Sequence, residues 1–353
     1  MPDLGRPYVS DVLRQAGATN HRTMRAGPAW AAVLEVLGVY VAGQLVMFAL
    51  ATVVGIELRN PLAGLTAQIS SPDLLAATRD LGVLLLLQYA GWLLLIVPIG
   101  WWHRRRSPAE YGLTKAGAPV ATLIVAGVVT FAAGEFAAKA LEAVNAVVPL
   151  GATAPWRQAV FEMSWTRWEF WLFTAVGSYA FVAFAEELFY RGYCQRRLAE
   201  DLGDGPAIVG VAALFTFSHG QYLIANPYSI GMVASLLLGS LAFGYIYART
   251  RSLIPSVVAH VLVNIPATLP FQLATLVAMG VVVWLARRQI ADALRRGLGW
   301  IREAAPRWLV PGMAVGGAAF AIVNQRASNV VLPAGIVGLV VAIGLGFREK
   351  RSG

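Results

Sequence analysis

The chain is poor in charge and in cysteine. Charged residues make up 13% of its 353 residues, about half of the share that is usual in soluble domains. By contrast, 58% of the residues are apolar and the mean hydropathy is +0.62. The single cysteine, Cys194, excludes an internal disulfide and a cysteine-based metal cluster. The composition therefore excludes an ordinary cytoplasmic enzyme, a disordered chain and a scaffold held by disulfides.

Other common signatures are also missing. Residues 1–28 are polar and basic, without the apolar core and the small-residue cleavage site of a signal peptide. The sequence has no HExxH pair of zinc ligands on one helix. It also has no serine or cysteine in a recognisable nucleophile elbow.

Long apolar stretches predict an all-α protein, a polytopic transmembrane helical bundle of about ten spans. We place the spans at residues 30–55, 81–102, 119–148, 168–192, 207–225, 229–248, 253–270, 271–286, 309–325 and 330–347. Pro266 and Pro270 interrupt the apolar run of 253–286, so this run forms either one span or two. The 35 glycines suit close contact between helices in lipid.

The basic residues predict the orientation and the location. Most of the 28 Lys and Arg residues precede the first span or follow the even-numbered ones. Because basic residues favour the cytoplasmic side, both ends of the chain are expected inside, at the cell membrane (plasma or inner). The net charge of +9 then reflects topology, and we expect the lipid bilayer rather than nucleic acid as a partner. Residues 287–308 read as an amphipathic helix on the inner leaflet or as a solvated connector.

Ionisable residues inside a span cost about 2.5 kcal/mol or more, which makes them candidates for function. Glu135, Lys139 and Glu142 lie at i, i+4 and i+7 and predict one polar stripe, in which Glu135 can pair with Lys139. The stripe is expected to face the inside of the bundle. Glu35 lies near the start of the first span, where it reaches interfacial water.

The end of span 168–192 carries a denser group. Glu187 and Arg191 lie at i, i+4 in the favoured acid-first order and predict a buried ion pair. Adjacent helical residues point about 100° apart, so Glu186 faces elsewhere, with Tyr190 one turn further on. Glu186 has no obvious partner in the sequence. A lone carboxylate within the membrane suits a general base.

Two later spans each carry a histidine. His219 follows Phe215 by four residues, and His260 precedes Asn264 by four, so His260 and Asn264 can face one point. We estimate the depth of each residue in the membrane by counting 1.5 Å per residue from the ends of the spans. His219, His260, Asn264 and Glu186 then lie at similar depths. The sequence therefore predicts that they converge.

These motifs resemble the CPBP family, which comprises CAAX-processing endopeptidases and bacteriocin-processing or immunity proteins and is also called the Abi family. The family pattern is EExxxR, then FxxxH, then HxxxN, on successive helices. In this chain the pattern is filled by Glu186, Glu187 and Arg191, then Phe215 and His219, then His260 and Asn264. The resemblance covers residues 168–270.

The resemblance implies an intramembrane endopeptidase that acts on a membrane-associated protein or peptide, in a cavity open toward the cytoplasm. It implies that Glu186 and His219 position and deprotonate the attacking water, and that His260 and Asn264 donate hydrogen bonds to the oxyanion. The residues that it implies as shaping the site are Glu187, Arg191, Phe215 and Tyr190.

The spans and the resemblance divide the chain into four segments. They are a cytoplasmic basic segment at 1–28, N-terminal transmembrane helices at 29–167, a CPBP-like catalytic core at 168–270, and a C-terminal transmembrane extension at 271–353.

We expect no cofactor, although zinc is an alternative. Glu186, His219 and His260 suffice in number as zinc ligands. They come from three separate helices, however, and ligation of Glu186 would remove the base. Two other functions stay open at this point, namely an ion-coupled transporter and a non-catalytic peptide-binding or immunity protein. Nothing in the sequence recognises a prenyl group, and it specifies neither the substrate nor the oligomeric state.

Overall fold

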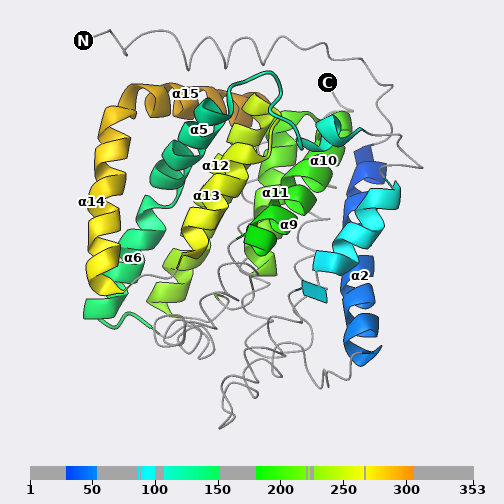
Figure 1. Ribbon diagram of the computed structural model, residues 1–353, viewed down its shortest axis with the longest axis horizontal. Coiled ribbons are helices and arrows are strands. Elements are labelled where there is room, and N and C mark those ends of the chain that lie inside the picture. The colour runs from blue at the N-terminus through cyan, green and yellow to red at the C-terminus, as the bar shows by residue number, and fades with distance from the viewer. Residues whose placement is uncertain are drawn as a thin grey trace.

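The computed structural model describes residues 29–53, 86–87, 89–99, 107–151, 180–219, 222, 226–265 and 268–304. Over these ranges the chain is helical and contains no strand, as predicted. The helices stand side by side, with α14 and α2 at opposite sides of the bundle (Figure 1). The predicted segment 1–28 and the spans 309–325 and 330–347 lie outside the described residues.

The helices follow the predicted spans in order. They are α2 (Ala29–Val53), a helix over Tyr89–Pro98, a short 3₁₀ turn η2 (Pro108–Tyr111), α5 (Val120–Gly134), α6 (Phe136–Val147), α9 (Ala183–Glu187), η4 (Leu188–Gln195), α10 (Arg196–Leu202), α11 (Asp204–Ser218), α12 (Pro227–Thr250), α13 (Ile254–Asn264), α14 (Leu269–Leu285) and α15 (Arg287–Ala304).

One described helix, α12, is by itself long and apolar enough to cross a membrane. Two pairs pass the same test when joined, α5 with α6 across a bend of 51° and α14 with α15 across a bend of 77°. The described residues thus hold one span by length and composition, or up to three. The count of about ten and the N-in, C-in orientation stay predictions.

The run 253–286 forms two helices, α13 and α14, with a break between Asn264 and Leu269. Pro270 lies in the first turn of α14. N–H groups in the first turn of a helix have no acceptor within the helix, so a proline there costs no hydrogen bond. The fixed φ of proline also suits the start of a helix. The structure therefore favours two elements over one kinked span.

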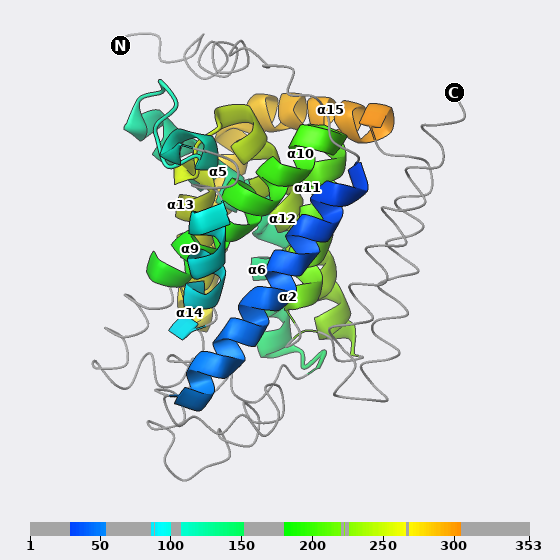
Figure 2. The same ribbon diagram turned by 90° about the vertical axis from the view of Figure 1, so that its right-hand side faces the viewer.

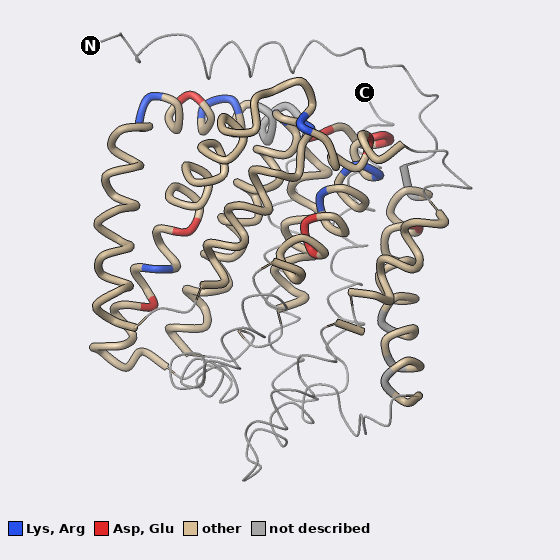
Figure 3. The backbone as a smooth tube through the Cα atoms, in the orientation of Figure 1, with Lys and Arg blue, Asp and Glu red and all other residues tan. Residues whose placement is uncertain are grey.

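The predicted connector is the helix α15, which lies across one end of the bundle (Figures 1 and 2). Lys and Arg residues gather at the same end (Figure 3). Within α15, Leu294 and Leu298 are exposed and lie one turn apart. The helical form of the connector is thus confirmed over 287–304, while its place on the inner leaflet stays a prediction.

An aromatic core joins the first helices to the centre of the bundle. Trp92 stacks on Phe189 of η4, with ring centroids 4.2 Å apart and an interplanar angle of 8°. The Nε1 atom of Trp92 donates a hydrogen bond to the Tyr40 carbonyl of α2 at 3.3 Å. The helix Tyr89–Pro98 is therefore fixed against both α2 and η4.

The helices α5 and α13 cross closely at Gly127. A Cβ atom added there would lie 2.7 Å from the Pro255 carbonyl oxygen and 2.8 Å from the Val258 Cβ atom. Since backbone cannot move aside as a flexible side chain does, only glycine permits this approach. The crossing sets the position of α13.

We expect Gly127→Ala to lower the melting temperature in detergent, because overpacking a close contact costs about 1–3 kcal/mol. The control is Gly280→Ala on α14, where the added Cβ atom would meet no heavy atom within 4 Å. The control should melt like the wild type. Equal melting of both variants would contradict the close crossing.

Candidate functional site

The two adjacent glutamates end the short helix α9, and the chain then widens into the π-helix η4. Both side chains are buried, Glu186 to 7% exposure and Glu187 to 0%. π-Helical turns are rare and often occur at functional sites, because they change the direction of side chains along a helix. Here the widened segment starts directly after the glutamates.

Glu187 and Arg191 form the predicted ion pair. Arg191 Nη1 donates to Oε1 of Glu187 at 3.0 Å, and both side chains have 0% exposure. Arg191 Nη2 donates to the hydroxyl of Ser240 on α12 at 2.8 Å. The guanidinium also lies over the ring of Phe215, 4.8 Å from its centroid. The buried cation is thereby held by three elements of the bundle.

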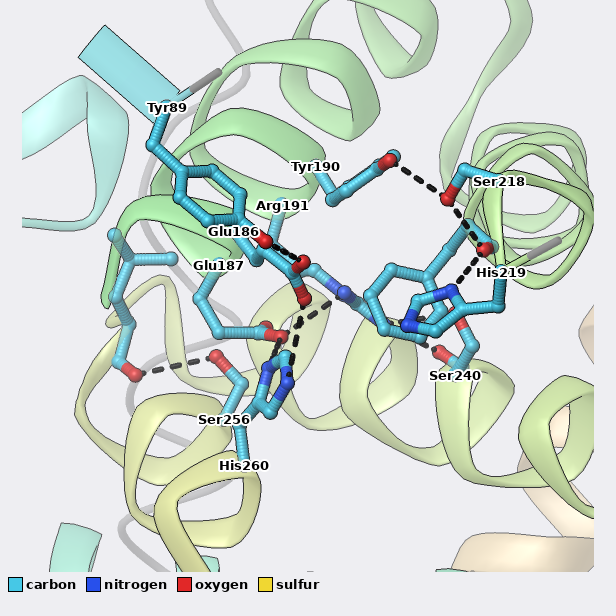
Figure 4. A network of polar contacts seen from close by, with 12 residues as sticks. Tyr89, Glu186, Glu187, Tyr190, Arg191, Ser218, His219, Ser240, Ser256 and His260 are labelled. Atoms are coloured by element: carbon cyan, nitrogen blue, oxygen red, sulfur yellow. Dashed lines mark hydrogen bonds and ion pairs between the residues drawn. The ribbon is translucent and has the colours of Figure 1, made fainter. Parts of the chain in front are cut away.

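His260 of α13 joins the two glutamates (Figure 4). Its Nδ1 atom lies 2.8 Å from Oε1 of Glu187, and its Nε2 atom lies 3.3 Å from Oε2 of Glu186. The helical spacing predicted that Glu186 and Glu187 face apart, yet one imidazole reaches both. We call Glu186, Glu187, Arg191 and His260 the carboxylate cluster.

The carboxylate cluster is balanced in charge when His260 is protonated. Each ring nitrogen faces a carboxylate oxygen, and an imidazole donates from both nitrogens only in its protonated form. Two carboxylates then offset one guanidinium and one imidazolium. A balanced set is the arrangement in which buried charges are tolerated, because an unpaired charge in the interior is expensive.

The expectation that Glu186 lacks a partner is wrong. Besides facing His260, Glu186 accepts a hydrogen bond at Oε1 from the hydroxyl of Tyr89. Tyr89 comes from the helix Tyr89–Pro98, and its only sequence signal is a hydroxyl within an apolar span. The sequence analysis missed Tyr89 for this reason, and it missed Ser240 in the same way.

His219 is the residue that follows α11, and it is half-buried. Its Nδ1 atom lies 2.7 Å from the Phe215 carbonyl oxygen, so Nδ1 carries the proton in the neutral ring. The Phe215 ring contacts both histidine rings, at centroid distances of 4.5 Å to His219 and 5.9 Å to His260. Phe215 thus links His219 to the carboxylate cluster.

Tyr190 lies beside His219, and not beside Glu186 alone. Its hydroxyl donates to Ser218 Oγ at 2.9 Å, directly before His219 in the chain. Its ring lies edge-on to Phe215, with centroids 5.0 Å apart. Tyr190 and Phe215 are therefore packing partners that shape the space between the two histidines.

Asn264 is the last residue of α13, one turn beyond His260, and it is half-buried. The neighbouring Val263 carbonyl accepts a hydrogen bond from Lys139 Nζ on α6 at 3.1 Å. Lys139 also pairs with Glu142 at 3.1 Å. The ion pair recorded in the predicted polar stripe is thus Lys139–Glu142, and the stripe faces the bundle and contacts the end of α13.

Glu35 does not simply reach water at the membrane surface. It accepts hydrogen bonds from Arg197 Nε at 2.8 Å and from the hydroxyl of Tyr193 at 3.1 Å. These contacts tie α2 to η4 and α10. The role of Glu35 is therefore structural.

The alternative zinc set is not assembled by the residues that the structure describes. Among these residues, no three His, Cys, Asp or Glu side chains form a group that could hold a metal ion. Both ring nitrogens of His260 face carboxylates instead. Glu186, His219 and His260 are thus not gathered as a set of metal ligands among the described residues, and the absence of a cofactor stays a prediction.

Comparison with known protein families matches residues 167–266 to the family described as Type II CAAX prenyl endopeptidase Rce1-like. The matched segment is less than a third of the chain and contains all three motifs. It confirms the resemblance to the CAAX-processing family for this segment. Comparisons with curated proteins and with solved structures gave no match.

We expect Glu187→Ala to destabilise the protein strongly. Its removal leaves Arg191 buried without its carboxylate, which costs about 3–5 kcal/mol. The measurement is a melting curve in detergent. Asp292→Asn is the control, because Asp292 pairs with Arg295 on the exposed face of α15 and such surface pairs contribute about 0–1 kcal/mol. If Glu187→Ala had the same melting temperature as Asp292→Asn and the wild type, the buried ion pair would not stabilise the fold.

Proposed function

We propose that this Rce1-like chain is an intramembrane endopeptidase, which hydrolyses a peptide bond in a membrane-associated protein or peptide. The observation that carries the proposal is the carboxylate cluster itself. In the segment that matches the family, Glu186 and Glu187 are buried and bridged by His260. A buried carboxylate beside a histidine is suited to proton transfer in a site that excludes bulk water.

In the proposed reaction, Glu186 acts as the general base. It takes a proton from a water molecule whose oxygen attacks the scissile carbonyl carbon, and the carbonyl π electrons move onto the oxygen. When this tetrahedral intermediate collapses, the C–N bond breaks and the leaving amine takes the proton from Glu186. One carboxyl thus serves as base and then as acid, and the protons balance.

The oxyanion of the tetrahedral intermediate needs hydrogen-bond donors that face it. In its protonated form His260 directs one N–H at Glu187 and the other, at Nε2, at Oε2 of Glu186. In the proposed reaction the Nε2–H hydrogen bond shifts from Oε2 to the oxyanion once Oε2 has taken the proton from the water, and the Asn264 amide supplies a second donor. Glu187 holds Nδ1 of His260 at 2.8 Å and so fixes the direction of the imidazole. His219 is proposed to position the attacking water, with Nε2 as the acceptor in the neutral ring.

No step of the proposed reaction passes through a metal ion. The support is chemical: a carboxylate that ligates a metal ion would not be available as the base, and His260 is already directed at two carboxylates. Glu187 and Arg191 shape the site, together with Phe215 and Tyr190.

The proposed setting is a multi-pass protein of the cell membrane with its active site open toward the cytoplasm. The apolar helices and the exposed apolar side chains of α14, such as Val277 and Leu285, support contact with lipid. The matched family is described as a CAAX prenyl endopeptidase. We carry over only the hydrolysis of a peptide bond at a membrane.

The test is Glu186→Gln, an almost isosteric change that removes the base and keeps the shape. We expect the variant to keep the fold and to lose most of the turnover. Membranes from cells that make either the wild type or the variant are compared by quantitative proteomics. At least one membrane-associated protein or peptide should accumulate uncut with Glu186→Gln.

The matched control is Glu200→Gln on α10, whose carboxylate lies 3.7 Å from Arg196 outside the carboxylate cluster. It should leave processing unchanged. Identical sets of cleaved proteins in wild-type and Glu186→Gln membranes would reject the peptidase. That result would favour the non-catalytic binding protein or the ion-coupled transporter.

A further inference from the structure

The hydrogen bond between Tyr89 and Glu186 joins the proposed base to a part of the chain outside the family match. Tyr89 belongs to the helix Tyr89–Pro98, whereas the match covers residues 167–266. The side chain is buried, with 3% exposure, and its hydroxyl donates to Oε1 of Glu186. Figure 4 shows the phenol ring directed at the carboxylate from the side opposite to His260. None of the three motifs includes this residue.

The two oxygens of Glu186 have different surroundings. Oε1 accepts from Tyr89, and Oε2 faces Nε2 of His260 at 3.3 Å. The last torsion of a glutamate side chain is broad, so an unrestrained carboxylate rotates between many orientations. Contacts at both oxygens from two different helices restrict this rotation.

Tyr89 is itself held in place by aromatic packing. Its ring lies edge-on to Trp92, with centroids 5.6 Å apart, and Trp92 stacks on Phe189 just beyond the two glutamates. At the other end of the same helix, the hydroxyl of Tyr111 donates to the Ile96 carbonyl at 3.2 Å. The helix is therefore anchored at Trp92 and at Ile96, both within the two turns that follow Tyr89.

We propose that Tyr89 is a positioning residue for Glu186. It binds Oε1 and thereby directs Oε2 toward His260, where the attacking water and the scissile carbonyl meet. Oε2 then takes the proton from the water and returns it to the leaving amine, while the hydrogen bond at Oε1 is kept throughout. This inference rests on the proposed function, because it assigns a partner to the same base.

Tyr89→Phe removes one hydroxyl and keeps the ring and its packing. Because misplacing a catalytic group by about 1 Å costs on the order of 100-fold in rate, we expect kcat to fall about 10- to 100-fold. KM should stay within about twofold, since Tyr89 contacts the base and not the substrate in this account. A purely structural role would lower the amount of folded protein without this separation of kcat from KM.

The matched control is Tyr111→Phe. It removes another buried tyrosine hydroxyl that donates to the same helix, at the Ile96 carbonyl, away from Glu186. Its kcat should stay within about twofold of the wild type. Turnover is measured on the monodisperse fraction of each purified protein, so that losses of folded protein do not enter the rate.

The substrate pool is membranes from cells that make Glu186→Gln, in which uncut substrate accumulates. Purified wild type, Tyr89→Phe or Tyr111→Phe is added at several membrane dilutions, and new peptide ends are counted by mass spectrometry over time. A Tyr89→Phe rate within twofold of the wild type would overturn the positioning role. Equal losses in both variants would overturn it too, because they would report the docking of the helix rather than the hydrogen bond.

The same experiment separates this inference from the proposed function. If the wild type produces no new peptide ends, the peptidase is rejected and the role of Tyr89 with it. If the wild type is active, Glu186→Gln is inactive and Tyr89→Phe matches the wild type, only the positioning role is rejected.

Discussion

One buried carboxylate oxygen connects the centre of this molecule. Oε1 of Glu187 accepts from Arg191 at 3.0 Å and faces Nδ1 of His260 at 2.8 Å, with no exposure of the Glu187 or Arg191 side chain. Because an unpaired charge in the interior is expensive, the helices that carry these groups must come together for any of them to be buried. Through Ser240 the same network extends to α12. This acceptor thus ties α9, η4 and α13 together, and Arg191 extends the tie to α12.

The chemistry follows from this constraint. Glu187 contacts Arg191 and His260, and in the proposed mechanism Glu186 is therefore the carboxylate of the pair that exchanges a proton. In the proposed mechanism His260 is protonated and donates from both ring nitrogens, while Tyr89 and His260 restrict the orientation of Glu186. The close crossing of α5 and α13 at Gly127 then fixes the helix on which both His260 and Asn264 lie. Fold and proposed mechanism therefore depend on the same few contacts.

The sequence predicted the parts of this site that depend on spacing along one helix. The separation of Glu187 from Arg191 by four residues is enough to predict their ion pair, and the structure confirms it. Contacts between helices distant in sequence leave no such pattern. Tyr89 lies in an apolar span with nothing to mark it. Lys139 pairs with Glu142 within α6, while Glu135 lies at the 51° bend between α5 and α6. The break between α13 and α14 was foreseen only as one of two options, since the prolines there are compatible with both.

The central claim is that Glu186 activates the water without a metal ion. The most direct measurement is the turnover of purified protein after treatment with a chelator, with the metal content of the same sample determined by elemental analysis. The account predicts full turnover when zinc is far below one ion per chain, and no gain when zinc is added. Turnover that falls with the zinc content and returns on adding zinc would contradict it.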